Sequence, residues 1–203
     1  MSGPGSTRLS APRIGLAFLA TLVPVSALAH SGAGVHLDFI HGLQHPLVGL
    51  DHLLVMLGVG FFAATLGQRA RWVLPMTFVT TMALTAFAAM IGALGGAPAE
   101  HWIALSVIAI GVPIALALQP GLPWAMALVA LCAVVHGHAH GVELPVAADA
   151  TVFMLGLVLS TALVHATGAL AGLGLNRISC AGVTLTRGAG AAIALAGLGL
   201  SLA

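Results

Sequence analysis

The sequence predicts an all-α fold, a bundle of membrane-spanning helices that follows a cleaved signal peptide. Two features of the composition lead to this prediction: 60% of the 203 residues are hydrophobic and only 5% are charged. Soluble domains carry about 25% charged residues, so this chain has too few polar side chains to cover a water-facing surface. The third observation is that long apolar segments recur along the chain, which is typical of a polytopic membrane protein.

The N-terminal segment has the three parts of a secretory signal peptide. Arg8 and Arg13 precede an apolar stretch over residues 14–23, and an Ala-Leu-Ala sequence then supplies small residues at a cleavage position. We therefore expect residues 1–29 to be removed and residues 30–203 to form a single transmembrane domain. The alternative, an uncleaved first membrane helix, is disfavoured because the apolar stretch is short.

Six further apolar segments follow the signal peptide. Each reaches the roughly 20 residues that a helix needs to cross about 30 Å of hydrocarbon. We expect membrane-spanning helices over residues 38–66, 72–94, 101–119, 122–142, 150–175 and 184–202.

The charged residues orient this bundle in the bacterial inner membrane. If the signal peptide is cleaved, the mature N-terminus lies in the periplasm and the helices alternate from there. All four arginines of the mature chain then fall on the cytoplasmic side, as the positive-inside rule requires; they are Arg69, Arg71, Arg177 and Arg187. Four acidic residues fall on the periplasmic side, namely Asp38, Glu100, Glu143 and Asp149.

The composition also excludes some functions. The chain has no lysine and its six arginines form no basic cluster, so nucleic acid is not an expected partner. It has no G-x-x-x-x-G-K-[ST] loop and cannot hydrolyse ATP by that route. Cys132 and Cys180 are expected in a helix and a cytoplasmic loop, so no disulfide is predicted. Membrane lipid is an expected partner, and the oligomeric state stays open.

Histidine is the residue type that stands out, with ten copies against eleven charged side chains. A histidine within a membrane is costly unless it is paired, bound to a metal or facing a cavity. Asp51 is expected to orient a neighbouring imidazole by accepting its second N–H, and Pro46 and Gly49 are positions where the first helix can kink. On one continuous helix, five polar or sulfur-bearing side chains would fall within about 60° of one another: Asp38, His41, His45, His52 and Met56.

A second histidine motif lies near the end of the fourth predicted span. His136, His140 and Glu143 are spaced i, i+4 and i+7 and so share a helix face, and such spacing brings two imidazoles to one metal. His138 points about 160° away from His136. His165 stands alone in the middle of the fifth span, where a packed, hydrogen-bonded histidine and a pathway ligand are both open readings.

The candidate ligands are expected at different depths in the membrane. His45 and His136 are expected about two turns deep, and His52 and His165 near the midplane. Cleavage would make His30 the new N-terminus, where the amine and the imidazole can chelate a metal together. The outermost residues of the series are His36, Asp38, His41, His140 and Glu143.

A series extended along the membrane normal suits passage better than a closed structural site. Imidazoles with few carboxylates favour Ni, Co, Cu or Zn, and the chain has too few Met and Cys residues on the stripe for a Cu(I) carrier. Zn²⁺ stays open. No permanently bound cofactor is expected, since the metal is cargo.

The two motifs resemble those of the HupE/UreJ family of nickel/cobalt permeases, which are associated with hydrogenase and urease maturation. The resemblance rests on residues 45–56, His-Pro-Leu-Val-Gly-Leu-Asp-His-Leu-Leu-Val-Met, and on residues 136–143, His-Gly-His-Ala-His-Gly-Val-Glu. It implies uptake of Ni²⁺ or Co²⁺ across the inner membrane by a protein that is not an enzyme. The metal-handling residues that it implies are His45, Asp51, His52, His136, His140 and Glu143.

Two other classes of function stay open. An intramembrane metalloenzyme would bring three ligands together at one depth with a general base, but the chain lacks the H-E-x-x-H motif. A periplasm-facing accessory protein that binds metal without transport would have no need of deeply buried imidazoles.

Overall fold

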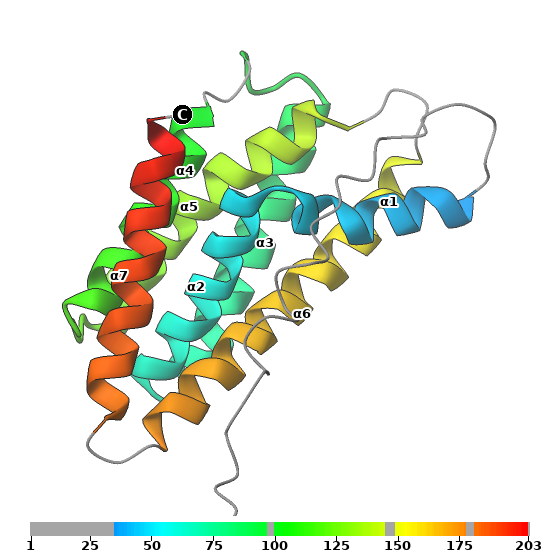
Figure 1. The fold of residues 1–203 in the computed structure, drawn as a ribbon. Helices are drawn as coiled ribbons and strands as arrows, with labels where there is room; N and C mark the ends of the chain where they lie inside the picture. The colour runs from blue at the N-terminus through cyan, green and yellow to red at the C-terminus, as the bar shows by residue number, and fades with distance from the viewer. Residues whose placement is uncertain (1–34, 97–99, 145–148, 178–180, 203) are drawn as a thin grey trace, which may run out of the picture. The chain divides into compact units, whose positions relative to one another are not determined.

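The computed structural model describes residues 35–96, 100–144, 149–177 and 181–202, and these contain seven α-helices and no β-strand (Figure 1). This confirms the all-α prediction. The predicted signal peptide and His30 lie outside the described residues. His36 lies in the first helix, but its side chain is also outside them.

The seven helices follow one another with short connections. Four of them, α3, α5, α6 and α7, are long and apolar enough to cross a membrane, and α1 and α2 together add a fifth span if this bent pair crosses as one. The helices are α1 Val35–Val48, α2 Leu50–Leu66, α3 Ala70–Met90, α4 Glu100–Ala115, α5 Leu122–Val142, α6 Ala150–Asn176 and α7 Gly182–Ser201.

The remaining predicted span, 101–119, is shorter than expected. Helix α4 has 16 residues, which gives a length of about 24 Å against the roughly 30 Å of a hydrocarbon core. It ends before Ala117, whose φ of 52° lies in the left-handed region and cannot continue a right-handed helix. The structure thus supports four to five of the six predicted spans by length and composition.

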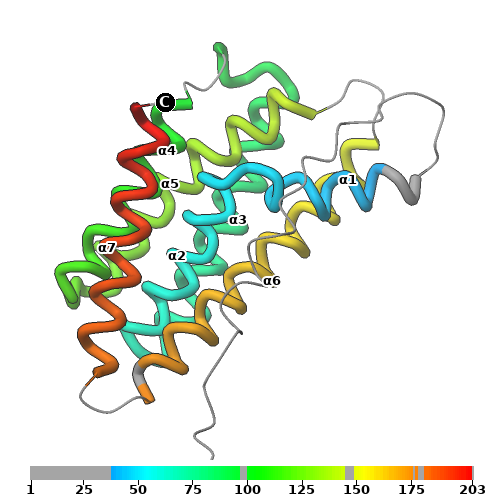
Figure 2. Tube along the Cα trace, viewed as in Figure 1, coloured from blue at the N-terminus to red at the C-terminus, as the bar shows by residue number. Residues whose placement is uncertain are grey.

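The prediction of one continuous helix over residues 38–66 is wrong. The chain breaks at Gly49, and α1 meets α2 at a bend of 83°, which Figure 2 shows as a sharp change of direction. Gly49 is extended, with φ −82° and ψ 117°. A Cβ at this position would lie 2.9 Å from His52 Nδ1 and 3.0 Å from Asp51 Oδ1. A larger residue here would therefore press on the two side chains, which fold back against the backbone at the break.

The bend changes one expectation about the first histidine motif. The stripe on one helix face does not form, because its members are divided between two helices with different directions. His52 lies in the first turn of α2, directly after the break, so the change of direction separates it from His45.

Glycines bring the helices of the bundle together in pairs. On α2 and α6, the backbone of Gly60 lies against the carbonyl of His165, and Gly168 lies against the backbone of Leu57. Close contacts of this kind are common in membrane helix packing, where small residues let two backbones approach. The other pairs are α1 with α6, through Gly42 and Gly156, α3 with α5, through Gly137 and Gly141, and α4 with α7, through Gly111 and Gly190.

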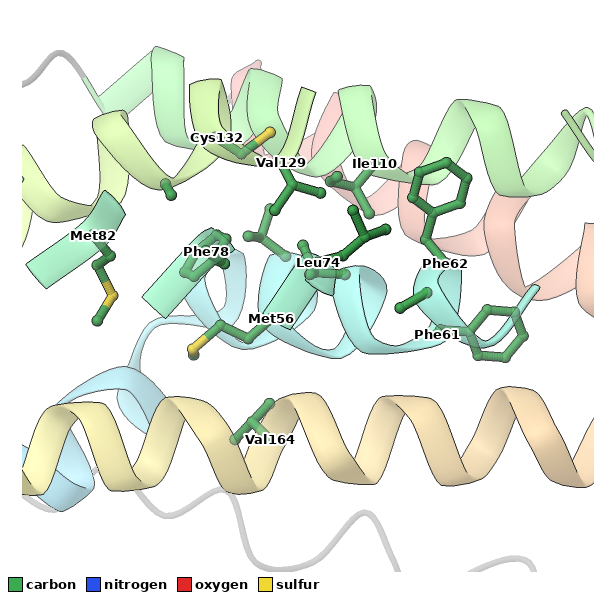
Figure 3. Close-up of a cluster of buried hydrophobic side chains, with 14 of the residues drawn as sticks. Met56, Phe61, Phe62, Leu74, Phe78, Met82, Ile110, Val129, Cys132 and Val164 are labelled. Carbon is green, nitrogen blue, oxygen red and sulfur yellow. The ribbon is translucent and has the colours of Figure 1, made fainter. Parts of the chain in front are cut away.

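Between these pairs lies an apolar core, drawn from α2, α3, α4, α5 and α6 (Figure 3). Its largest members include Phe62, Phe78, Met56, Leu74 and Met82, each no more than 1% exposed. This core separates the two ends of the bundle.

The charged side chains divide between these two ends. One end, called the acidic end below, carries all five acidic residues, Asp38, Asp51, Glu100, Glu143 and Asp149. The other, called the arginine end, carries the four arginines predicted to lie together, Arg69, Arg71, Arg177 and Arg187. The grouping of charges that the sequence predicted is thus present in the fold.

Candidate metal-binding site

A cleft opens at the acidic end of the bundle and encloses about 430 Å³. It forms where the break between α1 and α2 meets the first turn of α4 and the end of α5. The polar side chains that line it are His45, Asp51, His52, Glu100 and Glu143. Imidazoles and carboxylates therefore share one cavity, a combination that suits a divalent transition metal.

Three of the predicted ligands come together here, with His45 and Glu143 in the cleft lining and His140 buried beside them, and we call these three the cleft cluster. Their potential ligand atoms all lie within 4.8 Å of one another, and His45 Nε2 lies 3.3 Å from Glu143 Oε2. Two donors bound to one ion at about 2.1 Å each are about 3 to 4 Å apart. The cluster is therefore close to the geometry of a shared ion.

The cleft cluster extends from solvent into the bundle. Glu143 is 47% exposed and His45 33% exposed, whereas His140 is 1% exposed. The hydrogen bond with the His45 side chain holds the pKa of Glu143 below its ordinary value of 4.5, although partial burial opposes this shift. The carboxylate is therefore ionised at neutral pH and can attract a cation.

Asp51 holds the His52 ring in a fixed orientation. Its Oδ1 accepts hydrogen bonds from the backbone N–H of His52 at 2.8 Å and from the ring Nδ1 at 2.9 Å. This matches the orienting role predicted for Asp51, a device often found behind metal-binding histidines. The remaining nitrogen, Nε2, is buried and has no hydrogen-bond partner among the described residues.

His136 is held in the same way by the backbone of its own helix. Its Nδ1 lies 2.9 Å from the Cys132 carbonyl oxygen, and a carbonyl can only accept, so Nδ1 carries the proton. Its Nε2 is then an unprotonated acceptor, and nothing in the described part of the chain bonds to it.

His52 and His136 form what we call the deep pair. Their ring centroids are 4.9 Å apart, and the His52 ring is also 4.8 Å from that of His140. His140 thus belongs to the cleft cluster and touches the deep pair, and its own Nδ1 is buried without a partner in the described ranges. Unpaired buried polar atoms are few in folded proteins and call for an explanation such as a bound ion.

The structure places the other predicted residues away from this centre. Asp38 Oδ2 accepts a hydrogen bond of 3.0 Å from the backbone N–H of Asp149, which ties α1 to the start of α6. His41 is exposed. His165 lies deep in the bundle, 1% exposed, and His138 is half-buried with an Nε2 that finds no partner in the described segments.

Glu100 is a cleft residue that the sequence predicted only as one of the periplasmic charges. It begins α4 and lines the cleft opposite His45 and Glu143. The available signal was an acidic residue at the start of an apolar segment. The sequence alone does not say that this helix end meets the break between α1 and α2.

The fold and the site define a multi-pass helical membrane protein with a cleft lined by histidines and carboxylates. Residues 17–200 match the HupE / UreJ protein family. The chain is also 41% identical over 177 residues, 86% of its length and 90% of the relative's, to Protein HupE of Rhizobium leguminosarum bv. viciae. The chain therefore belongs to the HupE/UreJ family, which confirms the resemblance seen in its two motifs. No solved structure shows a significant match.

Proposed function

We propose that the protein carries Ni²⁺, with Co²⁺ as the second candidate ion, across the bacterial inner membrane for hydrogenase or urease maturation. The family is associated with uptake of these metals, and the chemistry of the donors supports such an ion. The observation that carries the proposal is the continuous set of imidazoles that runs from His45 and His52 in the open cleft to the buried His136 and His140, with three ring nitrogens left unbonded among the described residues.

Transport begins in the cleft, where carboxylates draw a cation from solution. Glu100 and Glu143 face the same cavity, and a cleft lined with one sign of charge raises the local concentration of counter-ions. His30 and His36 are further predicted capture residues. The cleft cluster then binds the ion.

The ion passes inward by exchange of one ligand at a time. His140 touches both His45 and His52, with ring centroids 5.0 Å and 4.8 Å apart. An ion held by His45 and Glu143 can therefore gain His52 before it loses the outer ligands. His136 follows, because its ring is next to that of His52.

The acidic end faces the periplasm in this proposal and the arginine end faces the cytoplasm, in agreement with the positive-inside rule. The mature N-terminus is periplasmic after loss of the signal peptide, and α4 completes a set of six spans. A divalent cation gains about 4.6 kcal/mol when it moves down 100 mV into the cell, twice the value for a single charge. Uptake by this route needs no ATP.

The convergence of three donors in the cleft cluster is also what a metalloenzyme would require, with Glu100 as a carboxylate base nearby. The deep pair favours transport instead. A catalytic centre needs imidazoles only as ligands of its metal. Further unbonded imidazoles beside the cleft cluster would have no role in it. The same argument disfavours a metal-binding accessory protein without transport.

Uptake of radiolabelled Ni²⁺ into proteoliposomes under an imposed potential tests the proposal. His52→Ala and His140→Ala should each lower the initial rate at least about tenfold, the size of effect seen when one metal ligand or its support is lost. His101→Ala is the matched control, because this exposed histidine lies outside the cleft. Parallel assays with Co²⁺ and Zn²⁺ rank the ions.

Two outcomes would contradict the proposal. Unchanged Ni²⁺ uptake in both variants would exclude the described pathway. Tight Ni²⁺ binding by the wild type without any uptake would favour the accessory protein or the enzyme.

A further inference from the structure

A groove separate from the cleft lies toward the arginine end of the bundle. It encloses about 460 Å³ between α2, α6 and α7, which lie next to one another in Figure 1. Leu57 and Phe61 line it from α2, Ala171 and Gly174 from α6, and Ile193 from α7. Every described residue of the lining is apolar or glycine, so the groove offers nothing to a metal ion and has no part in the pathway described above.

The length and the openness of this groove suit a lipid tail. On α6 its lining extends from Gly168 to Leu175, about 10 Å at 1.5 Å per residue, which is two-thirds of the roughly 15 Å of hydrocarbon in one leaflet. Ala171 and Gly174 are exposed, and a Cβ on Gly174 would meet no atom within 4 Å. Small residues therefore leave room on α6 for a chain that enters from the membrane.

A positive charge lies at the end of the groove. Arg177 follows Gly174 by three residues, so the two share a face of α6, and its backbone N–H donates to the Gly174 carbonyl at 3.1 Å. Its side chain is exposed and has no carboxylate partner among the described residues, because all five acidic residues lie at the acidic end. The guanidinium is therefore available to a phosphate, whose oxygens it can bind through two parallel N–H donors.

We propose that the groove binds one acyl chain of an anionic phospholipid whose phosphate pairs with Arg177. A basic residue beside a groove between membrane helices is the combination that recognises anionic headgroups. A second copy of the chain fits this face less well. Two copies joined here in the same membrane orientation would bring their Arg177 side chains to the same side of the membrane, with no carboxylate at that end to neutralise them.

Native mass spectrometry of the detergent-purified chain tests the charge. We expect the wild type to bind one phosphatidylglycerol about fivefold more tightly than phosphatidylcholine with the same acyl chains, the factor for one basic residue near an anionic lipid. Arg177→Gln should remove this preference. Arg71→Gln is the matched control, because it removes the same charge from α3, which contributes no residue to the groove, and it should keep the preference.

A second pair of variants tests the groove itself. Gly174→Leu fills it and should weaken phosphatidylglycerol binding about fivefold or more, the lower limit of the cost of forcing extra volume into a packed contact. Gly199→Leu should leave binding unchanged, because Gly199 also has open space around its potential Cβ but lies outside the groove. Unfolding temperatures close to that of the wild type would show that both variants fold.

Three results would overturn the proposal. Equal affinity of the wild type for the two lipids would exclude recognition of the anionic headgroup. Unchanged phosphatidylglycerol binding by Gly174→Leu would exclude the groove. A wild-type dimer without bound lipid that Gly174→Leu converts into a monomer would assign the groove to a second copy instead.

Discussion

Replacement of Gly168 by alanine is expected to loosen the contact between α2 and α6. A Cβ at this position would lie 2.9 Å from the carbonyl carbon and 3.1 Å from the Cα of Leu57, and it would overlap the Leu57 carbonyl oxygen. Carbon atoms normally approach to about 3.5 to 4.0 Å. Because the obstructing atoms belong to the backbone, the two helices must separate, and forcing extra volume into a packed contact costs about 1 to 3 kcal/mol.

The control for this prediction lies on the same helix. Gly174 has no atom within 4 Å of its potential Cβ, so Gly174→Ala meets only open space and gains up to about 1 kcal/mol from the higher helix propensity of alanine. Thermal or denaturant unfolding in detergent should therefore move in opposite directions for the two variants. Equal stability of Gly168→Ala and the wild type would refute the close backbone contact.

Further predictions concern the metal site. Asp51→Asn should lower Ni²⁺ affinity about 10- to 100-fold, because a charged partner of a metal-binding ring is lost. Asp149→Asn is the control and should not change the affinity, since Asn also caps a helix. Equal affinities of Asp51→Asn and the wild type by isothermal titration would exclude the orienting role of Asp51. Uptake should decline as pH falls from 7.5 to 5.5, because protons compete with the metal for imidazole nitrogens. Glu143 stays ionised over this range because its pKa lies below 4.5, so the decline would report the imidazoles, and a flat profile would contradict histidine ligation.

The sequence was sufficient for the features that depend on local pattern. Apolar segments separated by Gly, Pro and polar residues predicted helices. A chain with 5% charged residues is expected in lipid, where a helix satisfies the hydrogen bonds of the backbone within one segment. The spacing of His136 and His140 placed both on the face of α5 that meets the first motif. The adjacency of Asp51 and His52 likewise predicted the hydrogen bond between them.

The features that depend on tertiary contact were not predicted. Gly49 and Pro46 marked a place for a kink, but neither residue specifies a bend of 83°. That bend accompanies the contacts of His45 with Glu143 and of His52 with His140. Glu100 could not be assigned to the cleft because nothing local relates the start of α4 to the motif in α1 and α2.

The close glycine contacts have a consequence for motion. Helices whose backbones touch cannot slide or tilt apart without breaking those contacts. We therefore expect three helix pairs to move as rigid units: α2 with α6, α3 with α5, and α4 with α7. The cleft is lined by residues of all three pairs: His52 belongs to the first, Glu143 follows α5 of the second, and Glu100 belongs to the third. An ion in the cleft would hold the three helix pairs together through its ligands. Its departure would allow the pairs to separate near Phe78.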